Sequence, residues 1–142
     1  MQIELQRTDA DFRMEARNEH GNTVTLDASP AVGGHNSGMR PMQMLLASLG
    51  GCSSIDIVSI LRKQRQPIED LRVTIDAERE EDKMPALFTK IHLTYHLRGA
   101  LDKQKIQKAL DLSLQQYCSV AKIVEKTAEI TYSYTLNDEL SA

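Results

Sequence analysis

The two cysteines are the residues of this chain best suited to chemistry. Cys52 lies in the apolar run LLASLGGCSSIDIVSIL, and Cys118 lies in the later segment QQYCSVAK. Two distant cysteines without CxxC spacing suit a pair in which one thiol reacts with a peroxide and the other resolves the product as a disulfide. The alternative, which composition alone favours, is that Cys52 is a small buried apolar residue, as free cysteine most often is.

The surroundings of Cys118 favour the chemical interpretation. The residue falls at a joint between two predicted helical stretches, where its thiol can lie close to a helix N-terminus. Such a position lowers the pKa of a thiol. We therefore expect a depressed pKa for Cys118.

Cys52 sits in the middle of a predicted long helix that runs from about Pro41 to about Gln66 and is ended by Pro67. Its apolar residues cover more than one stripe, so it should be buried nearly all round, which one chain of this size can hardly achieve alone. A homodimer that brings two such helices together would bury them.

Gly50 and Gly51 precede the cysteine inside this helix. Together they cost roughly 1 to 2 kcal/mol relative to alanine. Close approach of another backbone or of a substrate would offset that cost. The alternative is that they only allow two helices to pack.

The other elements are predicted from alternating and helical periodicities. They comprise a three-stranded meander over 3–8, 11–17 and 23–28 with Gly21 in a turn, two long strands over 71–80 and 88–99 with a slip of period near Thr89, a helix capped by Asp102, a short helix over 119–128 and a closing strand over 129–136. Strands that cluster in hairpins favour an α+β fold with an antiparallel sheet. At 142 residues we expect a single domain over residues 1–142.

Charge and motifs exclude several classes of function. The net charge is −3 and the charges are mixed, so neither nucleic acid nor a membrane is an expected partner. The first residues show no export leader, so we expect a cytoplasmic protein whose thiols are kept reduced. No cofactor or metal motif is present, and His92 and His96, four apart on a strand, are separated by roughly 13 Å.

The segments PMQMLLASLGGCSSIDIVSIL and QYCSVAKIV resemble the family of osmotically induced protein C and the organic hydroperoxide resistance proteins (OsmC/Ohr). The resemblance implies an OsmC-like α+β fold, with antiparallel sheets around a buried central helix, in an intertwined homodimer. It also implies thiol peroxidase activity against organic hydroperoxides, with a role in oxidative stress. Cys52 would attack the peroxide and become a sulfenic acid, Cys118 would condense with it to a disulfide, and a dithiol reductant would reopen the bond.

The sequence departs from the hydroperoxide reductases next to the helix-opening proline. There a glutamate usually works with an arginine to hold the reactive thiolate, whereas Met42 and the neutral Gln43 follow Pro41 here. Arg13, Arg17 and Arg40 are the candidate arginines, and solvated surface charges are the favoured interpretation of each. The Gly-Gly-Cys and Ser-Ser-Ile-Asp signature is closer to a less characterised OsmC-like branch, for which no substrate is implied.

Two further hypotheses concern the surroundings of Cys52. Asp56, one helical turn later, would raise the thiol pKa if it faced the sulfur, although a hydrogen-bonded acid at a dimer seam is an equal alternative. The alternative function is non-enzymatic binding of a small apolar or thiol-reactive ligand in a dimer-interface pocket. That pocket would be lined by Met42, Met44, Leu46 and Leu49.

Overall fold

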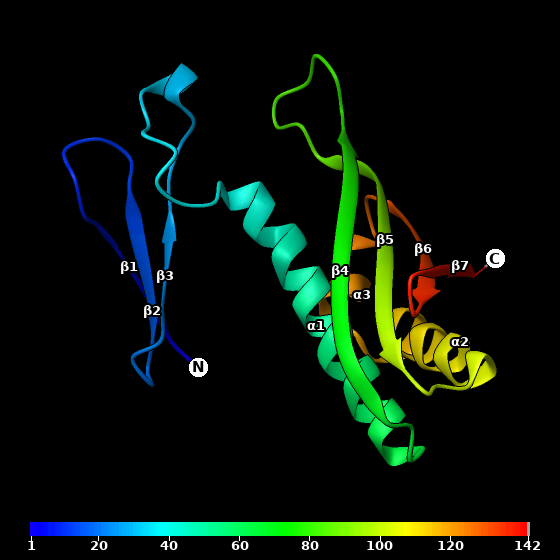
Figure 1. Ribbon diagram of the computed structural model, residues 1–142. Helices are drawn as coiled ribbons and strands as arrows, with labels where there is room; N and C mark the ends of the chain where they lie inside the picture. The colour runs from blue at the N-terminus through cyan, green and yellow to red at the C-terminus, as the bar shows by residue number, and fades with distance from the viewer. Residues whose placement is uncertain (142) are drawn as a thin grey trace. The chain divides into compact units, whose positions relative to one another are not determined.

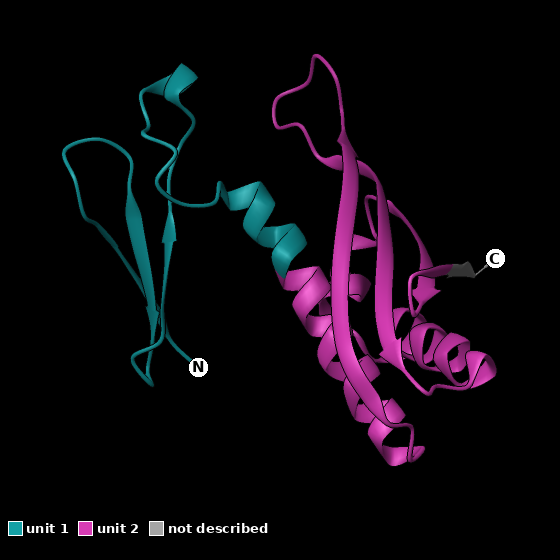
Figure 2. Ribbon diagram, viewed as in Figure 1, with its two compact units in different colours: residues 1–47 teal, residues 48–142 magenta. Residues whose placement is uncertain are grey.

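The computed structural model describes residues 1–141, and the chain forms two compact units. Unit 1 comprises Met1–Ala47 and unit 2 comprises Ser48–Ala142 (Figure 2). The long helix α1, Pro41–Lys63, begins in unit 1 and continues into unit 2.

Unit 1 is built on a three-stranded antiparallel meander, as predicted (Figure 1). Its strands are β1 (Ile3–Arg7), β2 (Met14–Asn18) and β3 (Thr23–Leu26), followed by a single 3₁₀ turn η1 (Pro30–Val32). Gly21, in the β2–β3 turn, has a φ of 83°, which glycine adopts without steric cost.

Helix α1 ends three residues before the predicted Gln66 because its last turn closes in a Schellman motif. Arg65 takes a left-handed φ of 57°, its N–H bonds the carbonyl of Arg62, and the N–H of Gln66 bonds the carbonyl of Leu61. This arrangement satisfies carbonyls that a helix end otherwise leaves unpaired.

Only one face of α1 is buried within the chain. Leu49, Ile57 and Leu61 are fully buried, whereas Ile55 is 73 % exposed. By length and hydropathy α1 could cross a membrane, with a mean hydropathy of 1.8 over its most apolar 18 residues, but the core helices of soluble proteins meet the same criterion. The exposed apolar face is the part that the sequence predicted a partner chain to cover.

Unit 2 contains a four-stranded sheet in the order β4-β5-β6-β7. The strands are β4 (Ile68–Arg79), β5 (Phe88–Gly99), β6 (Glu129–Leu136) and β7 (Glu139–Ser141). Glu78 pairs with Lys90 and Arg79 with Phe88, which leaves Thr89 as the extra residue of a bulge and confirms the predicted slip. β6 runs parallel to β5, so a wholly antiparallel sheet was a wrong expectation; the intervening helices provide the crossover that a parallel pair needs.

The crossover consists of α2 (Lys103–Leu112), the π-helical turn η2 (Ser113–Tyr117) and α3 (Ser119–Val124). Asp102 caps α2 as predicted, because its carboxylate accepts from the N–H of Lys105 at 3.0 Å. The inward-facing residues of β5 form the centre of the core and are at most 6 % exposed, namely Phe88, Ile91, Leu93, Tyr95 and Leu97. The mixed α+β architecture agrees with the predicted fold class.

Candidate functional site

The structure brings the two cysteines together with one carboxylate. The sulfurs of Cys52 and Cys118 and a carboxylate oxygen of Asp56 all lie within 4.8 Å of one another. Cys52 and Asp56 are four residues apart on one face of α1, and Cys118 precedes the first residue of α3. We call these three residues the thiol cluster; both cysteines in it are free.

The two thiols differ in exposure and in acidity. Cys52 is half-buried and Cys118 is completely buried. Burial, the neighbouring Cys52 and the charge of Asp56 together raise the pKa of Cys118 to about 11, and burial is the largest cause. The N–H of Ala121, which donates to the Cys118 sulfur at 3.3 Å, favours the thiolate but is outweighed by burial. The predicted lowering of the Cys118 pKa was therefore wrong, and this thiol is protonated at neutral pH.

The π-helical turn η2 positions both Cys118 and a serine that contacts Asp56. The N–H of Cys118 donates to the carbonyl of Ser113 at 2.7 Å, which closes the wide turn. The hydroxyl of Ser113, which is fully buried, donates to Asp56 Oδ2 at 3.0 Å and lies 3.3 Å from the carbonyl oxygen of Ser53. Sequence periodicity could not reveal Ser113, since a single π turn leaves no pattern of its own.

Behind the thiol cluster, α1 is fixed to the sheet by a buried hydrogen-bond chain. Tyr95 Oη donates to Ser53 Oγ at 2.7 Å, and Ser53 Oγ donates to the carbonyl of Leu49 at 2.9 Å. Burial raises the pKa of Tyr95, so its hydroxyl stays a donor at physiological pH. These two hydrogen bonds hold the turn of α1 that carries Cys52.

The two glycines of α1 have different surroundings. A Cβ on Gly50 would lie 2.9 Å from Cδ1 of Ile75 in β4, so this glycine permits a close approach within unit 2. Among the described residues, no packing neighbour would lie within 4 Å of a Cβ on Gly51. Packing inside the chain therefore accounts for Gly50 and leaves Gly51 facing open space.

A groove of about 550 Å³ lies beside Asp56. Its lining combines polar, charged and apolar side chains, namely Asp56, Ser59, Ile60, Lys63, Gln64, Lys108, Leu112 and Tyr117. Leu49, which the sequence placed in an apolar ligand pocket, is fully buried in the core.

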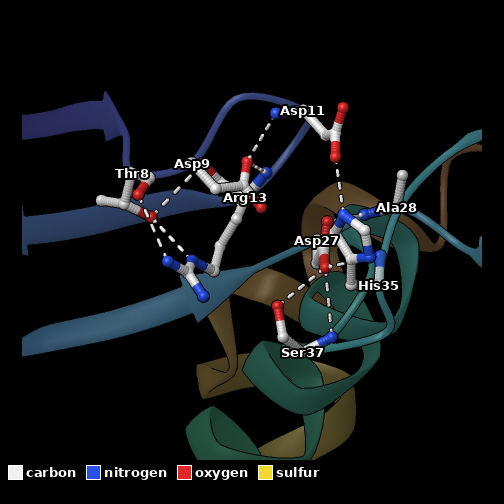
Figure 3. Close-up of polar contacts among 8 residues, drawn as sticks. All are labelled: Thr8, Asp9, Asp11, Arg13, Asp27, Ala28, His35 and Ser37. Atoms are coloured by element: carbon white, nitrogen blue, oxygen red, sulfur yellow. Dashed lines mark hydrogen bonds and ion pairs between the residues drawn. The ribbon is translucent and has the colours of Figure 1, made fainter.

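Unit 1 carries a second polar cluster, on loops (Figure 3). Nε2 of His35 lies 2.6 Å from Oδ2 of Asp11, and Asp9 Oδ1 accepts from the N–H groups of Asp11 and Arg13 at 2.9 and 3.1 Å. The ligating atoms of Asp9, Asp11 and His35 lie within 4.8 Å of one another, and we call these three residues the loop cluster. The Asp11 carboxylate, as the hydrogen-bond acceptor of the His35 ring, raises the pKa of His35.

Asp27 organises the loop that carries His35. It is 3 % exposed, and its carboxylate accepts from the N–H groups of Ala28, His35 and Ser37 and from the hydroxyl of Ser37, as Figure 3 shows. These bonds, led by the Ser37 hydroxyl, hold the pKa of Asp27 well below its usual range. The contacts of His35 in unit 1 are thus structural.

The candidate arginines of unit 1 are engaged locally. Arg13 donates to the hydroxyl and carbonyl oxygens of Thr8, and the exposed Arg17 pairs with Glu15 at 3.2 Å. The first turn of α1 contains no acidic residue, and Gln43 there accepts from the N–H of Arg40 at 3.0 Å. Gln43 therefore serves as a capping residue, and the arrangement found in the hydroperoxide reductases is absent from this turn.

His92 and His96 of β5 are accounted for by hydrogen bonds to hydroxyl groups. The ring nitrogens of His92 lie 2.7 and 3.0 Å from the hydroxyls of Thr131 and Ser133. His96 contacts Thr74 and Thr135 in the same way, at 3.1 and 3.0 Å.

Comparison with known proteins assigns the family. The family model described as OsmC-like protein matches residues 34–133. The chain belongs to the OsmC-like protein family. A curated relative of this OsmC-like protein, Protein YhfA of Escherichia coli K12, is 47 % identical over 95 residues, which cover 66 % of this chain and 70 % of YhfA.

Solved structures share the fold of this OsmC-like protein. A hypothetical protein from Aquifex aeolicus VF5 aligns with a TM-score of 0.82 at 26 % identity, covering 96 % of this chain and 95 % of that chain. A putative organic hydroperoxide resistance protein from Vibrio cholerae, which has captopril bound in one of its active sites, aligns with a TM-score of 0.69 at 15 % identity, covering 99 % of this chain and 94 % of that chain. The second of these likenesses shows the fold alone.

Proposed function

We propose that this OsmC-like protein reduces organic hydroperoxides through Cys52 and Cys118. The observation that carries the proposal is the pairing of a half-buried sulfur with a completely buried one within 4.8 Å. A peroxide can reach the half-buried Cys52 thiol, and the buried Cys118 thiol lies beside it, within reach of the oxidised Cys52 sulfur.

In this scheme the thiolate of Cys52 attacks one peroxide oxygen. The O–O bond breaks, the alcohol leaves with a proton, and Cys52 becomes a sulfenic acid. Cys118 then attacks the Cys52 sulfur, the S–O bond breaks, and water leaves as the disulfide forms. Two electrons pass from the thiols to the peroxide, and a dithiol reductant restores them.

The environment of Cys118 suits the resolving role. With a pKa of about 11, its thiol is protonated at neutral pH and reacts poorly with a peroxide from solution. It must lose this proton when it attacks the sulfenic acid. The carboxylate of Asp56, within 4.8 Å of both sulfurs and oriented by Ser113, is placed to accept it.

The experiment that tests the proposal is oxidation of the reduced protein with tert-butyl hydroperoxide, cumene hydroperoxide and hydrogen peroxide, followed by mass spectrometry. We expect a Cys52–Cys118 disulfide in the wild type, a Cys52 sulfenic acid trapped by dimedone in Cys118→Ser, and neither product in Cys52→Ser. Oxidation of the wild type no faster than that of free cysteine would refute the proposal.

We also propose that two chains form a homodimer through the exposed face of α1. A groove of about 640 Å³ runs along this face, lined by Ser54, Ile55, Val58, Ser59, Arg62, Lys63 and Leu71. Burying an apolar face of this kind is the main driving force for association. Ile55→Glu should give monomers in light scattering, whereas Ile123→Glu, at a position of matching exposure (71 %), should leave the dimer intact. A monomeric wild type would contradict the proposal.

We also propose that the protein is a single OsmC-like domain and that it works in the cytoplasm. The family match over residues 34–133 crosses from unit 1 into unit 2, which supports one domain over residues 1–142. A single cooperative transition in thermal unfolding would be expected, and two separate transitions would refute the single domain.

A second candidate function is ligand binding without turnover. The groove beside Asp56 favours it, since Ile60, Leu112 and Tyr117 offer apolar surface close to the thiol cluster. In that case a bound ligand would slow alkylation of Cys52, and peroxide would produce no sulfenic acid in Cys118→Ser.

A further inference from the structure

We propose that the thiol cluster of the reduced protein binds one soft divalent cation, with Zn²⁺ the best match, through the sulfurs of Cys52 and Cys118 and the carboxylate of Asp56. This inference concerns the same residues as the proposed peroxidase but does not depend on that activity.

The arrangement of the three groups fits a metal site. Two ligands four residues apart on one helix face, completed by a third from another element, is the layout used by helical zinc sites. Around a tetrahedral Zn²⁺ the ligand atoms lie roughly 3.5 to 3.8 Å apart, given Zn–S bonds of about 2.3 Å. The atoms of the thiol cluster, all within 4.8 Å of one another, need only a small closure to reach this geometry.

Neighbouring groups orient two of the three ligands. Ser113 Oγ donates to one carboxylate oxygen of Asp56, and the N–H of Ala121 donates to the sulfur of Cys118. Second-shell hydrogen bonds of this kind fix the orientation of metal ligands. Because Cys52 and Asp56 are only half-buried, a fourth position can be taken by water, as in open zinc sites.

The charges of the thiol cluster also favour a cation. All three members are acids, and among residues 1–141 Asp56 forms no ion pair; Lys63 and Lys108, which line the adjacent groove, lie beyond ion-pair distance of its oxygens. A divalent cation would displace the thiol protons on binding and offset the repulsion among the two resulting thiolates and the carboxylate. Thiolate ligands select Zn²⁺ over Mg²⁺ and Ca²⁺, which prefer oxygen.

The inference couples metal occupancy to the redox state of the cysteines. Oxidation of the two metal-bound thiolates by a hydroperoxide forms the disulfide, consumes two protons, and yields one alcohol, one water and the free cation. The disulfide offers no thiolate ligand, so only the reduced protein should hold the metal. Metal and peroxide would therefore compete for the same pair of sulfurs.

The test is anaerobic titration of the full-length reduced protein with Co²⁺ as an absorbing substitute for Zn²⁺. We expect one Co²⁺ per chain with a thiolate-to-metal charge-transfer band, displacement of Co²⁺ by Zn²⁺ but not by Mg²⁺, and no band after oxidation with diamide. Cys52→Ser and Cys118→Ser should each weaken binding at least about 100-fold, and Ser113→Ala about 10-fold.

The control is Asp11→Asn, a substitution in the exposed loop cluster. There the Asp11 carboxylate is already hydrogen-bonded to the His35 ring nitrogen. The substitution should leave the titration unchanged, and circular dichroism should show that every variant is folded. Absence of the charge-transfer band, or binding that persists in folded Cys118→Ser, would overturn the inference. Zinc binding by a protein that fails the hydroperoxide test would refute the proposed activity alone.

Discussion

The thiol cluster of unit 2, with two cysteines and an aspartate, and the loop cluster of unit 1, with two aspartates and a histidine, are equally close-set but have different surroundings. In each, three potential ligands lie within 4.8 Å of one another. Helices and a wide helical turn hold the thiol cluster beside the core, and its buried member Cys118 has a raised pKa and stays neutral. The loop cluster is largely exposed, and its histidine has a raised pKa because of a neighbouring carboxylate, which favours the charged form. Proximity alone thus does not define a reactive site; burial decides which groups remain neutral and shielded from reagents in solution.

The largest effect that would sharpen this comparison is on the rate at which the protein reduces peroxide. Cys52→Ser should reduce it to the background set by the remaining buried thiol, because the accessible nucleophile is gone. Asp11→Asn, the matched change in the loop cluster, should leave the rate unchanged. Stopped-flow measurement of peroxide consumption checks both, and an equal loss in the two variants would break the comparison.

The next effect concerns alkylation of Cys118. In chelator-treated, reduced protein, maleimide should modify Cys52 readily and Cys118 only as the pH approaches about 11, where its thiolate forms. Asp56→Asn should shift the Cys118 profile to lower pH, because a negative charge that opposes the thiolate is removed. Peptide mapping after timed quenching gives both profiles. Equal alkylation of the two cysteines at neutral pH would contradict the assigned roles.

A matched pair of serines gives a smaller effect, on stability. Ser113 and Ser37 each donate a hydroxyl to a carboxylate, at 3.0 Å to Asp56 and at 2.8 Å to Asp27. Ser113→Ala should lower the free energy of unfolding by about 1 to 3 kcal/mol, since it removes a buried donor to a charged acceptor. Ser37→Ala should cost less, because three N–H groups still donate to Asp27. Urea unfolding measures both, and the opposite order would show that the loop is the more tightly held region.

The smallest effect is the titration of His35. The hydrogen bond to Asp11 raises its pKa, so the pair stabilises the protein below the ordinary histidine pKa of 6.5, and this contribution is lost as the pH rises through the folded-state pKa. Asp11→Asn should return the His35 pKa toward 6.5 and remove that pH dependence. NMR titration of the imidazole protons in the wild type and in Asp11→Asn checks the shift. An unchanged His35 pKa would show that another group causes the shift.

Most of the fold follows from local patterns in the sequence. Alternation identified the meander, β4, β5 and β6, and the period slip identified the bulge at Thr89 because a bulge moves later side chains to the other face. The parallel pairing of β6 with β5 and the Schellman ending of α1 at Lys63 were not predicted. Both depend on tertiary pairing and backbone conformation, which residue types leave undetermined.

The candidate site was predictable only in part. The residue types indicated Cys52 and Cys118, and their separation of at most 4.8 Å is a property of the fold that no spacing rule supplies. The direction of the Cys118 pKa shift was predicted wrongly, because a helix terminus can be inferred from sequence whereas the extent of burial cannot. Ser113 was missed because a single π turn leaves no pattern in the sequence and because its contact with Asp56 crosses from η2 to α1.

The wide turn η2 makes this segment more sensitive to deletions than to substitutions. The N–H of Cys118 reaches back five residues to Ser113, and an ordinary α-helix would reach back four. Deleting any one residue between them would allow the regular pattern and rotate the following segment by about 100° relative to α2. The sulfur would then turn away from α1 even though every side chain of the thiol cluster were kept. Substitutions at the exposed Gln116 should thus be tolerated during divergence, whereas a change in the length of this segment should not.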